Sequence, residues 1–196
     1  GWLVSLRIPS SLTGIPRKAS TIVTYGRSVR AFCHWAVRKG YLQQTPVVRG
    51  ILPKAEKKRI QVIEPEEFDR LLLACRPAGE SAATLDRIAA RNRSILWILM
   101  DTGMRVSELC GLRLSDVNRE QRSLRVRGRG NERWLPLSPN GWFQVLSYLE
   151  QYRPKEGFSE EEQVRDAPLF LSETYQPLTI NALTLLFGRL RKRTEM

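Results

Sequence analysis

Arg105 and Glu108 are the pair of side chains in this sequence best suited to chemistry on a phosphodiester. They lie three positions apart at the start of a short predicted helix. A guanidinium can neutralise the charge that grows on the non-bridging oxygens during attack, and helix N–H groups add positive potential there. Glu108 would share a helical face with Arg105 and could orient it or a neighbouring base. An ordinary surface ion pair has the same spacing, and the two residues alone favour that simpler interpretation.

A second group of candidates lies in the stretch 119–133, which holds six arginines and two glutamates, a net charge of +4. Alternating residues at 123–126 and 133–137 flank Gly-Arg-Gly-Asn at 128–131, the pattern of a β-hairpin. A two-stranded ribbon can lie against a DNA groove and place its loop at the backbone. A solvated arginine-rich turn is the alternative. We predict DNA contacts from Arg127, Arg129 and Arg133.

Helices must position these candidates, and apolar residues at spacings of three and four predict where they lie. The predicted helices cover 20–39, 65–73, 93–101, 106–112, about 140–152, and 179 to the basic end of the chain. The segment 169–171 is predicted as a short strand. The expected fold class is therefore mainly α with a small β-hairpin or sheet.

The first and last of these helices add further candidate contacts. Ser20 is expected to cap the first helix, and Gly40 to end it. Its predicted core stripe is Ile22, Tyr25, Val29, Phe32 and Ala36. The opposite face carries Arg27 and Arg30, which we expect to contact DNA phosphates. The last helix ends in a basic run, in which Arg191 and Lys192 are predicted contacts.

The net charge of the chain agrees with a nucleic-acid partner. Lysine and arginine total 32 against 20 acidic residues, which gives a net charge of +12 and an isoelectric point near 10.3. Binding to phosphates would release counterions, which favours duplex DNA as the partner. Arginine outnumbers lysine by 25 to 7, and its planar fork suits bidentate contact with phosphate or guanine. Acidic lipid is the rival, but no amphipathic basic helix with an exposed aromatic face stands out.

Composition argues against a metal site and a membrane span. The cysteines fit neither a disulfide framework nor a metal-binding pair, so Cys33 and Cys75 are predicted to be small buried residues. No run approaches the roughly 18 apolar residues of a membrane span. The sequence starts without a signal peptide and without an initiator Met. This start is the one expected of a processed chain or of part of a longer reading frame. We expect a cytoplasmic, nucleoid-associated, prokaryotic protein with no cofactor or metal.

The segment around Arg105 resembles the tyrosine recombinase, or phage integrase, family. Residues 102–109 read Thr-Gly-Met-Arg-Val-Ser-Glu-Leu, similar to the family's TG-x-R-x-S-E-L. Leu-x-x-Ser-Asp-Val, a Gly-x-Gly hairpin ending Arg-x-x-Pro-Leu, and Pro-Leu-Phe-Leu-Ser before a helix follow in the family's order. Upstream, Tyr25, Phe32, Trp35 and Gly40 resemble the end of its core-binding domain. The resemblance covers nearly all of the chain from about residue 20 onward.

The resemblance implies DNA strand cleavage and rejoining in site-specific recombination, with Arg105 and Glu108 as catalytic residues. Duplex DNA and other recombinase protomers on that DNA are the implied partners, with no membrane. The family carries a lysine in the hairpin loop that protonates the leaving 5′ oxygen, where this chain has Arg129. A guanidinium with a pKa above about 12 is a poor proton donor, so Arg129 is predicted to stabilise charge instead.

The family's His-x-x-Arg segment and nucleophilic tyrosine would follow the helix that closes this sequence. None of the five tyrosines matches the nucleophile position, and His34 is expected to be structural. Covalent catalysis needs a nucleophile supported by acid–base and phosphate-binding groups. We therefore expect this polypeptide to bind DNA without cleaving it.

The expected organisation is a partial, helical core-binding domain over 1–53, a charged linker over 54–61, and a partial catalytic domain over 62–196. Two alternatives to a partial recombinase stay open. One is a short relative without catalysis that regulates recombination sites by binding them. The other is a basic helical module that binds RNA or a protein.

Overall fold

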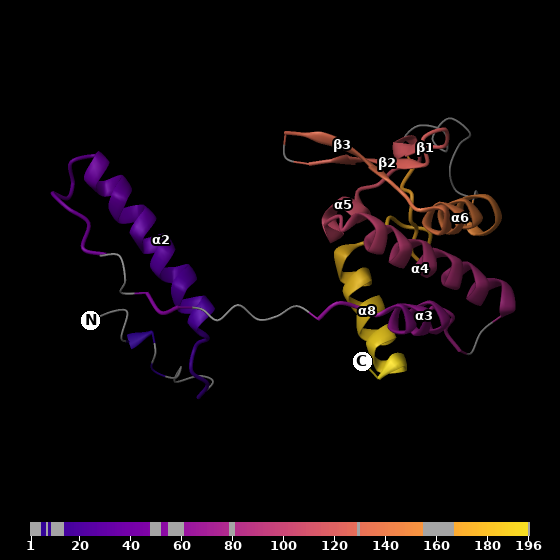
Figure 1. Cartoon of the computed structure of the whole chain (residues 1–196), viewed down its shortest axis with the longest axis horizontal. Coiled ribbons are helices and arrows are strands. Elements are labelled where there is room, and N and C mark those ends of the chain that lie inside the picture. Colours follow the sequence, from indigo (N-terminus) through magenta and orange to yellow (C-terminus); the bar gives the residue numbers. More distant parts are fainter. Residues whose placement is uncertain are drawn as a thin grey trace. The chain divides into compact units, whose positions relative to one another are not determined.

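The computed structural model describes residues 5–6, 8, 14–47, 52–54, 61–78, 81–128, 130–154 and 167–195. The chain divides into two compact units, Gly1–Val62 and Ile63–Met196 (Figure 1). The division falls beside the end of the predicted charged linker, most of which lies outside the described residues. Assignment of the two units to a core-binding and a catalytic domain stays a prediction.

The first unit contains α2 (Ala19–Arg38), an amphipathic helix. Gly26 lies on its buried face because a Cβ there would collide with the side chain of Leu52. The prediction that Tyr25 and Phe32 belong to this face is wrong, since the two residues are 46% and 63% exposed. Two adjacent faces of the helix share the three-and-four spacing, and the face with the small residues is the buried one. Its members are Ile22, Gly26, Cys33 and Ala36.

The two ends of α2 differ in how well the sequence predicts them. Ser20 does not cap the helix, which begins one residue earlier with Lys18 as the N-cap and no side-chain cap. The predicted end at Gly40 is confirmed: Gly40 has a φ of +78°, a conformation that glycine adopts without strain.

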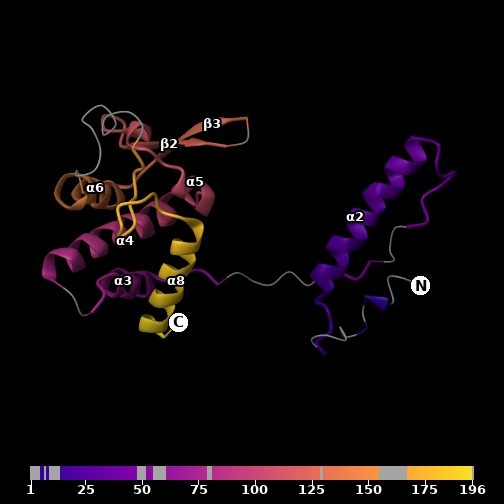
Figure 2. The ribbon, with the colours of Figure 1, turned by 180° about the vertical axis from the view of Figure 1, so that it is seen from behind.

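The second unit is mainly helical and carries one small sheet (Figures 1 and 2). Its helices are α3 (Pro65–Ala74), α4 (Ala82–Thr102), α5 (Val106–Cys110), α6 (Pro139–Ser147) and α8 (Ile180–Thr194), with a π-helical turn, Tyr148–Tyr152, directly after α6. Helix α4 packs against α6, and α3 packs against α8. The predicted helix starts are confirmed at two places. Pro65 is the first residue of α3, and Thr179 caps α8 through its Oγ1, which accepts a hydrogen bond from the Ala182 amide at 3.1 Å.

The predicted hairpin is confirmed and belongs to a three-stranded antiparallel sheet. The strands β1 (Val117–Asn118), β2 (Ser123–Arg127) and β3 (Glu132–Pro136) lie in that order, and β1 was not predicted. The Gly128 amide donates to the Asn131 carbonyl at 2.8 Å across the turn. Pro136 ends the edge strand, where a residue without an N–H is tolerated. Both views show β2 and β3 projecting as a ribbon beyond the helices, with α5 below it (Figures 1 and 2).

The predicted strand at 169–171 is wrong, because this segment forms only two isolated bridges, Arg113 with Pro168 and Leu171 with Pro177. Arginine side chains, instead of a neighbouring strand, bind several of its carbonyl groups. Arg153 donates to Pro168 and Leu169 at 2.7 and 3.2 Å, and Arg91 donates to Leu171 at 2.9 Å. The apolar side chains of the segment are buried, although the backbone is not a strand.

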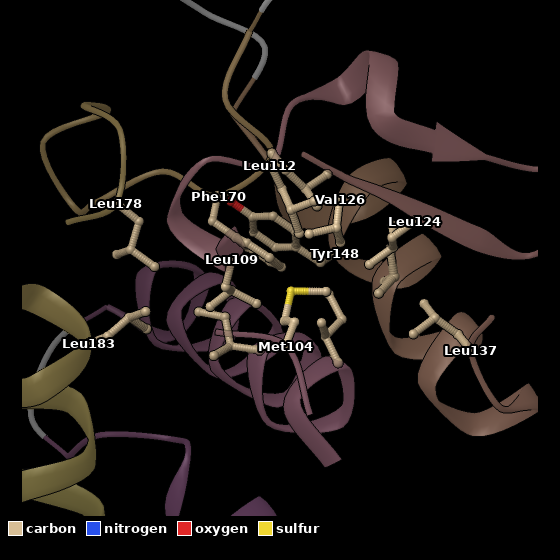
Figure 3. Close-up of a cluster of buried hydrophobic side chains, with 14 of the residues drawn as sticks. Met104, Leu109, Leu112, Leu124, Val126, Leu137, Tyr148, Phe170, Leu178 and Leu183 are labelled. Atoms are coloured by element: carbon tan, nitrogen blue, oxygen red, sulfur yellow. The ribbon is translucent and has the colours of Figure 1, made fainter. Parts of the chain in front are cut away.

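The main core of this unit fixes both elements that carry the candidate residues (Figure 3). Met104 and Leu109 are 4% and 1% exposed, so the core holds the chain on both sides of Arg105. Leu124 and Val126 of β2 are buried in the same cluster. Because side chains alternate along a strand, the arginines between and after them point to the other face of the ribbon.

A second cluster joins α3, α4 and α8 through Phe68, Leu71, Cys75, Leu96 and Leu190. Burial raises the pKa of the Cys75 thiol to about 12, so this cysteine is an inert core residue. Cys33 of the first unit is also buried, and both predictions of small buried cysteines are therefore confirmed. Within the described part of the chain, no helix is long and apolar enough to cross a membrane.

Candidate nucleic-acid interface

Arg105 occupies the N-cap position of α5, directly after the αL residue Gly103 and the buried Met104. Its backbone is extended, with φ of −69° and ψ of 147°, so the chain turns into the helix after it. The Arg105 amide donates to Oε2 of Glu108 at 2.8 Å. An acidic residue at this third helical position satisfies an amide that the first turn of the helix leaves unpaired. The spacing of the two residues thus first serves the local fold.

Glu108 joins Arg105 to the hairpin. Nη1 and Nη2 of Arg133 bind Oε1 and Oε2 of Glu108 at 3.1 and 2.9 Å, a bidentate pair. Nη1 of Arg105 lies 3.2 Å from the same Oε1. The Glu108 side chain is 6% exposed, whereas those of Arg105 and Arg133 are 77% and 44% exposed. Two guanidinium groups therefore share one carboxylate, which leaves a net charge of +1 and an accessible fork on Arg105.

These contacts also shift the ionisation of Glu108. The hydrogen bonds from the Arg133 side chain, and then the Arg105 amide, lower the pKa of the Glu108 carboxyl to about 2. The same pair raises the pKa of Arg133. The carboxylate is therefore fully ionised near neutrality and unsuited to accept a proton there.

We expect the Glu108 carboxyl to titrate near pH 2 in carbon-detected NMR of the folded chain, and at a higher pH in an Arg133→Gln variant, because the first cause of the shift is removed. The folded pKa lies below the unfolded value of about 4.3. Stability from this cluster is thus present above about pH 4.3 and is lost as the pH falls through about 2. An Arg119→Gln variant is the control, since Arg119 pairs with Glu150 instead. An unmoved Glu108 midpoint in Arg133→Gln would contradict the assigned cause.

A second carboxylate, Asp116, was not predicted as a functional residue. It is 2% exposed, and its Oδ1 lies 3.0 Å from Nε of Arg125 and 3.0 Å from Nη2 of Arg127. Its Oδ2 accepts from the Arg113 amide at 3.0 Å. Arg127 also lies 3.6 Å from Glu132 across the ribbon. Arg127, which was predicted to contact DNA, thus takes part in ion pairs. Its pair with Asp116 holds β2 against the helical turn Leu114–Asp116, which precedes β1.

The sequence did contain a signal for Asp116. Arginine and an acid three residues later occur at Arg105 and Glu108, and again at Arg113 and Asp116. In both places the acid accepts from the backbone amide of the arginine. In both places a hairpin arginine binds the same acid. At these two positions the spacing coincides with an anchor point of the ribbon, but the same spacing also occurs at Arg129 and Glu132 and at Arg153 and Glu156.

The other predicted contacts do not join this cluster. Arg191 and Lys192 are exposed in the last turn of α8, and Arg27 is exposed on α2. Nε of Arg30 donates to Nε2 of His34 at 3.3 Å, so His34 has a partner on its own helix. Arg129 lies outside the described residues. Of the predicted residues, the structure brings together Arg105, Glu108 and Arg133.

Tyr148 is a core residue in this structure. It is 1% exposed, stacks on Phe170 with ring centroids 5.4 Å apart, and accepts a hydrogen bond from the Leu171 amide at 3.4 Å. Burial raises its pKa. In the described residues, no group of three or more His, Cys, Asp or Glu is arranged to hold a metal ion.

The fold and this cluster define a helical protein whose basic hairpin meets an arginine–carboxylate cluster at the start of a short helix. The sequence pattern of the phage integrase family matches residues 61–196, and the chain belongs to that family. It is 35% identical over 129 residues to the tyrosine recombinase XerC of Mycobacterium tuberculosis strain H37Ra, and 35% over 136 residues to XerC of Mycobacterium sp. strain KMS. The matches cover 65% and 69% of this chain, and 42% and 44% of those relatives.

Solved structures show the same fold at lower sequence identity. The integrase of transposon Tn1549, in complex with circular intermediate DNA, matches with a TM-score of 0.70 and 19% identity over 99% of this chain and 62% of that chain. A lambda integrase dimer bound to a COC′ core site matches with a TM-score of 0.62 and 15% identity over 91% of this chain and 57% of the other. The mainly helical fold with a small sheet, predicted from the sequence, is therefore confirmed.

Proposed function

We propose that this chain supplies DNA binding and phosphate neutralisation to a site-specific recombinase. The observation that carries the proposal is the exposed guanidinium of Arg105, which Glu108 anchors on a helix N-terminus beside an arginine-rich ribbon. Relatives that match 129 and 136 residues of this chain are named tyrosine recombinases, and the similar integrase structures are named as DNA complexes. The proposal gives Arg105 the role of neutralising a phosphate and leaves the nucleophile unassigned.

Further exposed cations of the chain would add contacts with the DNA backbone. Arg27 of α2, together with Arg191 and Lys192 of α8, would bind the DNA backbone as exposed cations. The first unit would serve as a core-binding domain, and Arg129 would stabilise charge. Other protomers would bind the same DNA, as in the lambda integrase dimer. The cytoplasm is the proposed compartment.

An Arg105→Ala substitution tests the proposal. We expect it to weaken binding of duplex DNA roughly tenfold, the effect of one lost charge-assisted contact, and to lower the slope of log affinity against log salt by about one. Fluorescence anisotropy with labelled duplex DNA, and with duplex RNA of matching sequence, measures both quantities. The wild-type chain should prefer the DNA.

Arg119→Ala is the matched control, because Arg119 is also an exposed arginine, 62% accessible, paired with one glutamate at 2.7 Å. We expect its DNA affinity to stay within about twofold of wild type, since an exposed ion pair of this kind contributes little free energy. Equal losses from the two variants would show that Arg105 has no special contact. Equal affinity of the wild-type chain for the two nucleic acids would favour an RNA-binding module.

A further inference from the structure

We infer that Arg133 is a positioning residue: it acts through Glu108 to hold the Arg105 guanidinium open toward phosphate and does not itself contact DNA. The inference rests on the proposed function of Arg105. It replaces the simpler prediction that Arg133, like other arginines of the hairpin, is a backbone contact.

The hydrogen bonds of Glu108 carry the first step of the argument. Oε1 accepts from Nη1 of Arg105 and Nη1 of Arg133, and Oε2 accepts from the Arg105 amide and Nη2 of Arg133. A carboxylate offers about four lone-pair positions, so these four bonds use its full capacity. Only one side-chain nitrogen of Arg105 can therefore donate a hydrogen bond to Glu108. The remaining N–H groups of its fork stay available to a phosphate oxygen.

The direction of the Arg133 side chain carries the second step. Both terminal nitrogens of Arg133 are committed to a side chain that is 6% exposed. The turn backbone lies beside this pair, because a Cβ built on Gly128 would come within 3.9 Å of Nη1 of Arg133 and 4.0 Å of Oε1 of Glu108. Arg105 instead has a 77% exposed side chain. Of the two arginines, Arg105 is the one presented for a ligand.

The consequence of removing Arg133 follows from these contacts. Without it, two lone-pair positions of a nearly buried carboxylate lose their donors. The nearest available cation is Arg105, which can turn its second terminal nitrogen onto Glu108 and close the fork. Arg133→Gln would therefore weaken DNA binding by disabling Arg105, and not by removing a contact of its own.

A double-mutant cycle on the full chain tests this inference with a duplex DNA of random sequence as the probe. We expect Arg133→Gln and Arg105→Ala each to weaken binding roughly tenfold. The double variant should bind within about twofold of Arg105→Ala alone, because interacting residues give non-additive effects. Losses that multiply to roughly a hundredfold would show that Arg133 contacts DNA directly and would overturn the inference. An Arg133→Gln variant with wild-type affinity would also overturn it.

The proposed function can fail separately. If Arg105→Ala binds like wild type, Arg105 is no phosphate contact, and the function proposed above fails whatever Arg133 does. Arg119→Gln is the matched control for Arg133→Gln, since it removes the same charge from an exposed arginine–glutamate pair. It should bind within about twofold of wild type.

Glu108→Gln gives a second test, because the net charge and the positioning of Arg105 predict opposite changes in DNA affinity for this variant. The substitution raises the net charge from +12 to +13. If the overall charge governs affinity, this variant binds DNA more tightly than wild type. If Glu108 and Arg133 position Arg105, it binds roughly tenfold more weakly, because an amide offers only one oxygen to two guanidiniums. Circular dichroism at the binding temperature separates this loss from unfolding, and tighter binding by a folded variant overturns the inference.

Discussion

Raising the salt concentration from about 50 to about 200 mM should lower the affinity of the wild-type chain for duplex DNA roughly a thousandfold. The net charge of +12 is the driving cause, because each neutralised phosphate releases condensed counterions whose gain in entropy shrinks as salt rises. A fall of this size corresponds to about six phosphate contacts. The measurement is fluorescence anisotropy of one labelled duplex over a salt series.

The structure indicates which cations should determine the slope of log affinity against log salt concentration. Arg27, Arg191 and Lys192 are exposed, whereas Arg125 and Arg127 are held by Asp116. A double substitution of Arg191 and Lys192 by Gln should therefore lower the slope by about two, one per lost contact. Arg119→Gln, which breaks an exposed pair with Glu150, should leave the slope nearly unchanged. A wild-type affinity that does not change over the salt series would refute electrostatic binding to the DNA backbone.

The sequence predicts the fold well where local signals and burial agree. Gly40 ends α2 in a left-handed conformation, and Pro65 and Thr179 lie at the predicted starts of α3 and α8. Each of these signals acts within one helical turn, so no knowledge of distant residues is needed. The hairpin is predicted for the same reason, since its turn lies between two adjacent strands.

The errors arise where a distant partner decides the outcome. The buried face of α2 depends on Leu52, which approaches Gly26 closely, and a helical period cannot show which of two neighbouring faces will be covered. The segment 169–171 is apolar like a strand, but Arg153 and Arg91 bind its carbonyl groups. Neither contact has a signature in the local sequence.

The same reasoning explains what could be predicted of the candidate site. Arg105 and Glu108 lie in one turn, and their spacing correctly indicates contact. Arg133 is 25 residues from Glu108 in sequence, and its basic charge gives only a general prediction of phosphate contact. The ion pair between Arg127 and Asp116 cannot be predicted from the local sequence either, because it depends on the register of the sheet. Charge patterns therefore reveal a basic surface but not which arginines are free.

Asp116 is a buried acid outside the ribbon that binds two of its arginines, and its replacement should cost substantial stability. We expect Asp116→Ala to lower the free energy of unfolding by about 3 kcal/mol, because it removes the carboxylate that accepts from the Arg113 amide and that two arginines share as a buried counter-ion. Losses at buried ion pairs reach about 5 kcal/mol, but Arg125 and Arg127 are 28% and 47% exposed and can recover water. The melting temperature should fall by roughly 10 °C.

Two further substitutions separate the causes of this loss. Glu132→Ala is the matched control, since Glu132 is a 58% exposed acid that meets the same Arg127 at 3.6 Å, and it should cost less than about 0.5 kcal/mol. Asp116→Asn keeps an oxygen for the Arg113 amide and removes only the charge, so its loss should fall between the other two. Thermal denaturation of the three variants measures this order. If Asp116→Ala is no less stable than Glu132→Ala, the buried carboxylate does not hold the ribbon.

DNA binding by the folded Asp116→Asn variant then reports what the ribbon geometry contributes. The substitution raises the net charge from +12 to +13, so a purely electrostatic interface binds DNA at least as tightly as before. If the ribbon must be held in register to support Arg133 and Glu108, the variant binds DNA more weakly, although Arg125 and Arg127 have lost a charged partner. We expect the weaker binding, because Arg127 and Arg133 anchor β2 and β3 of the same ribbon to two different acids.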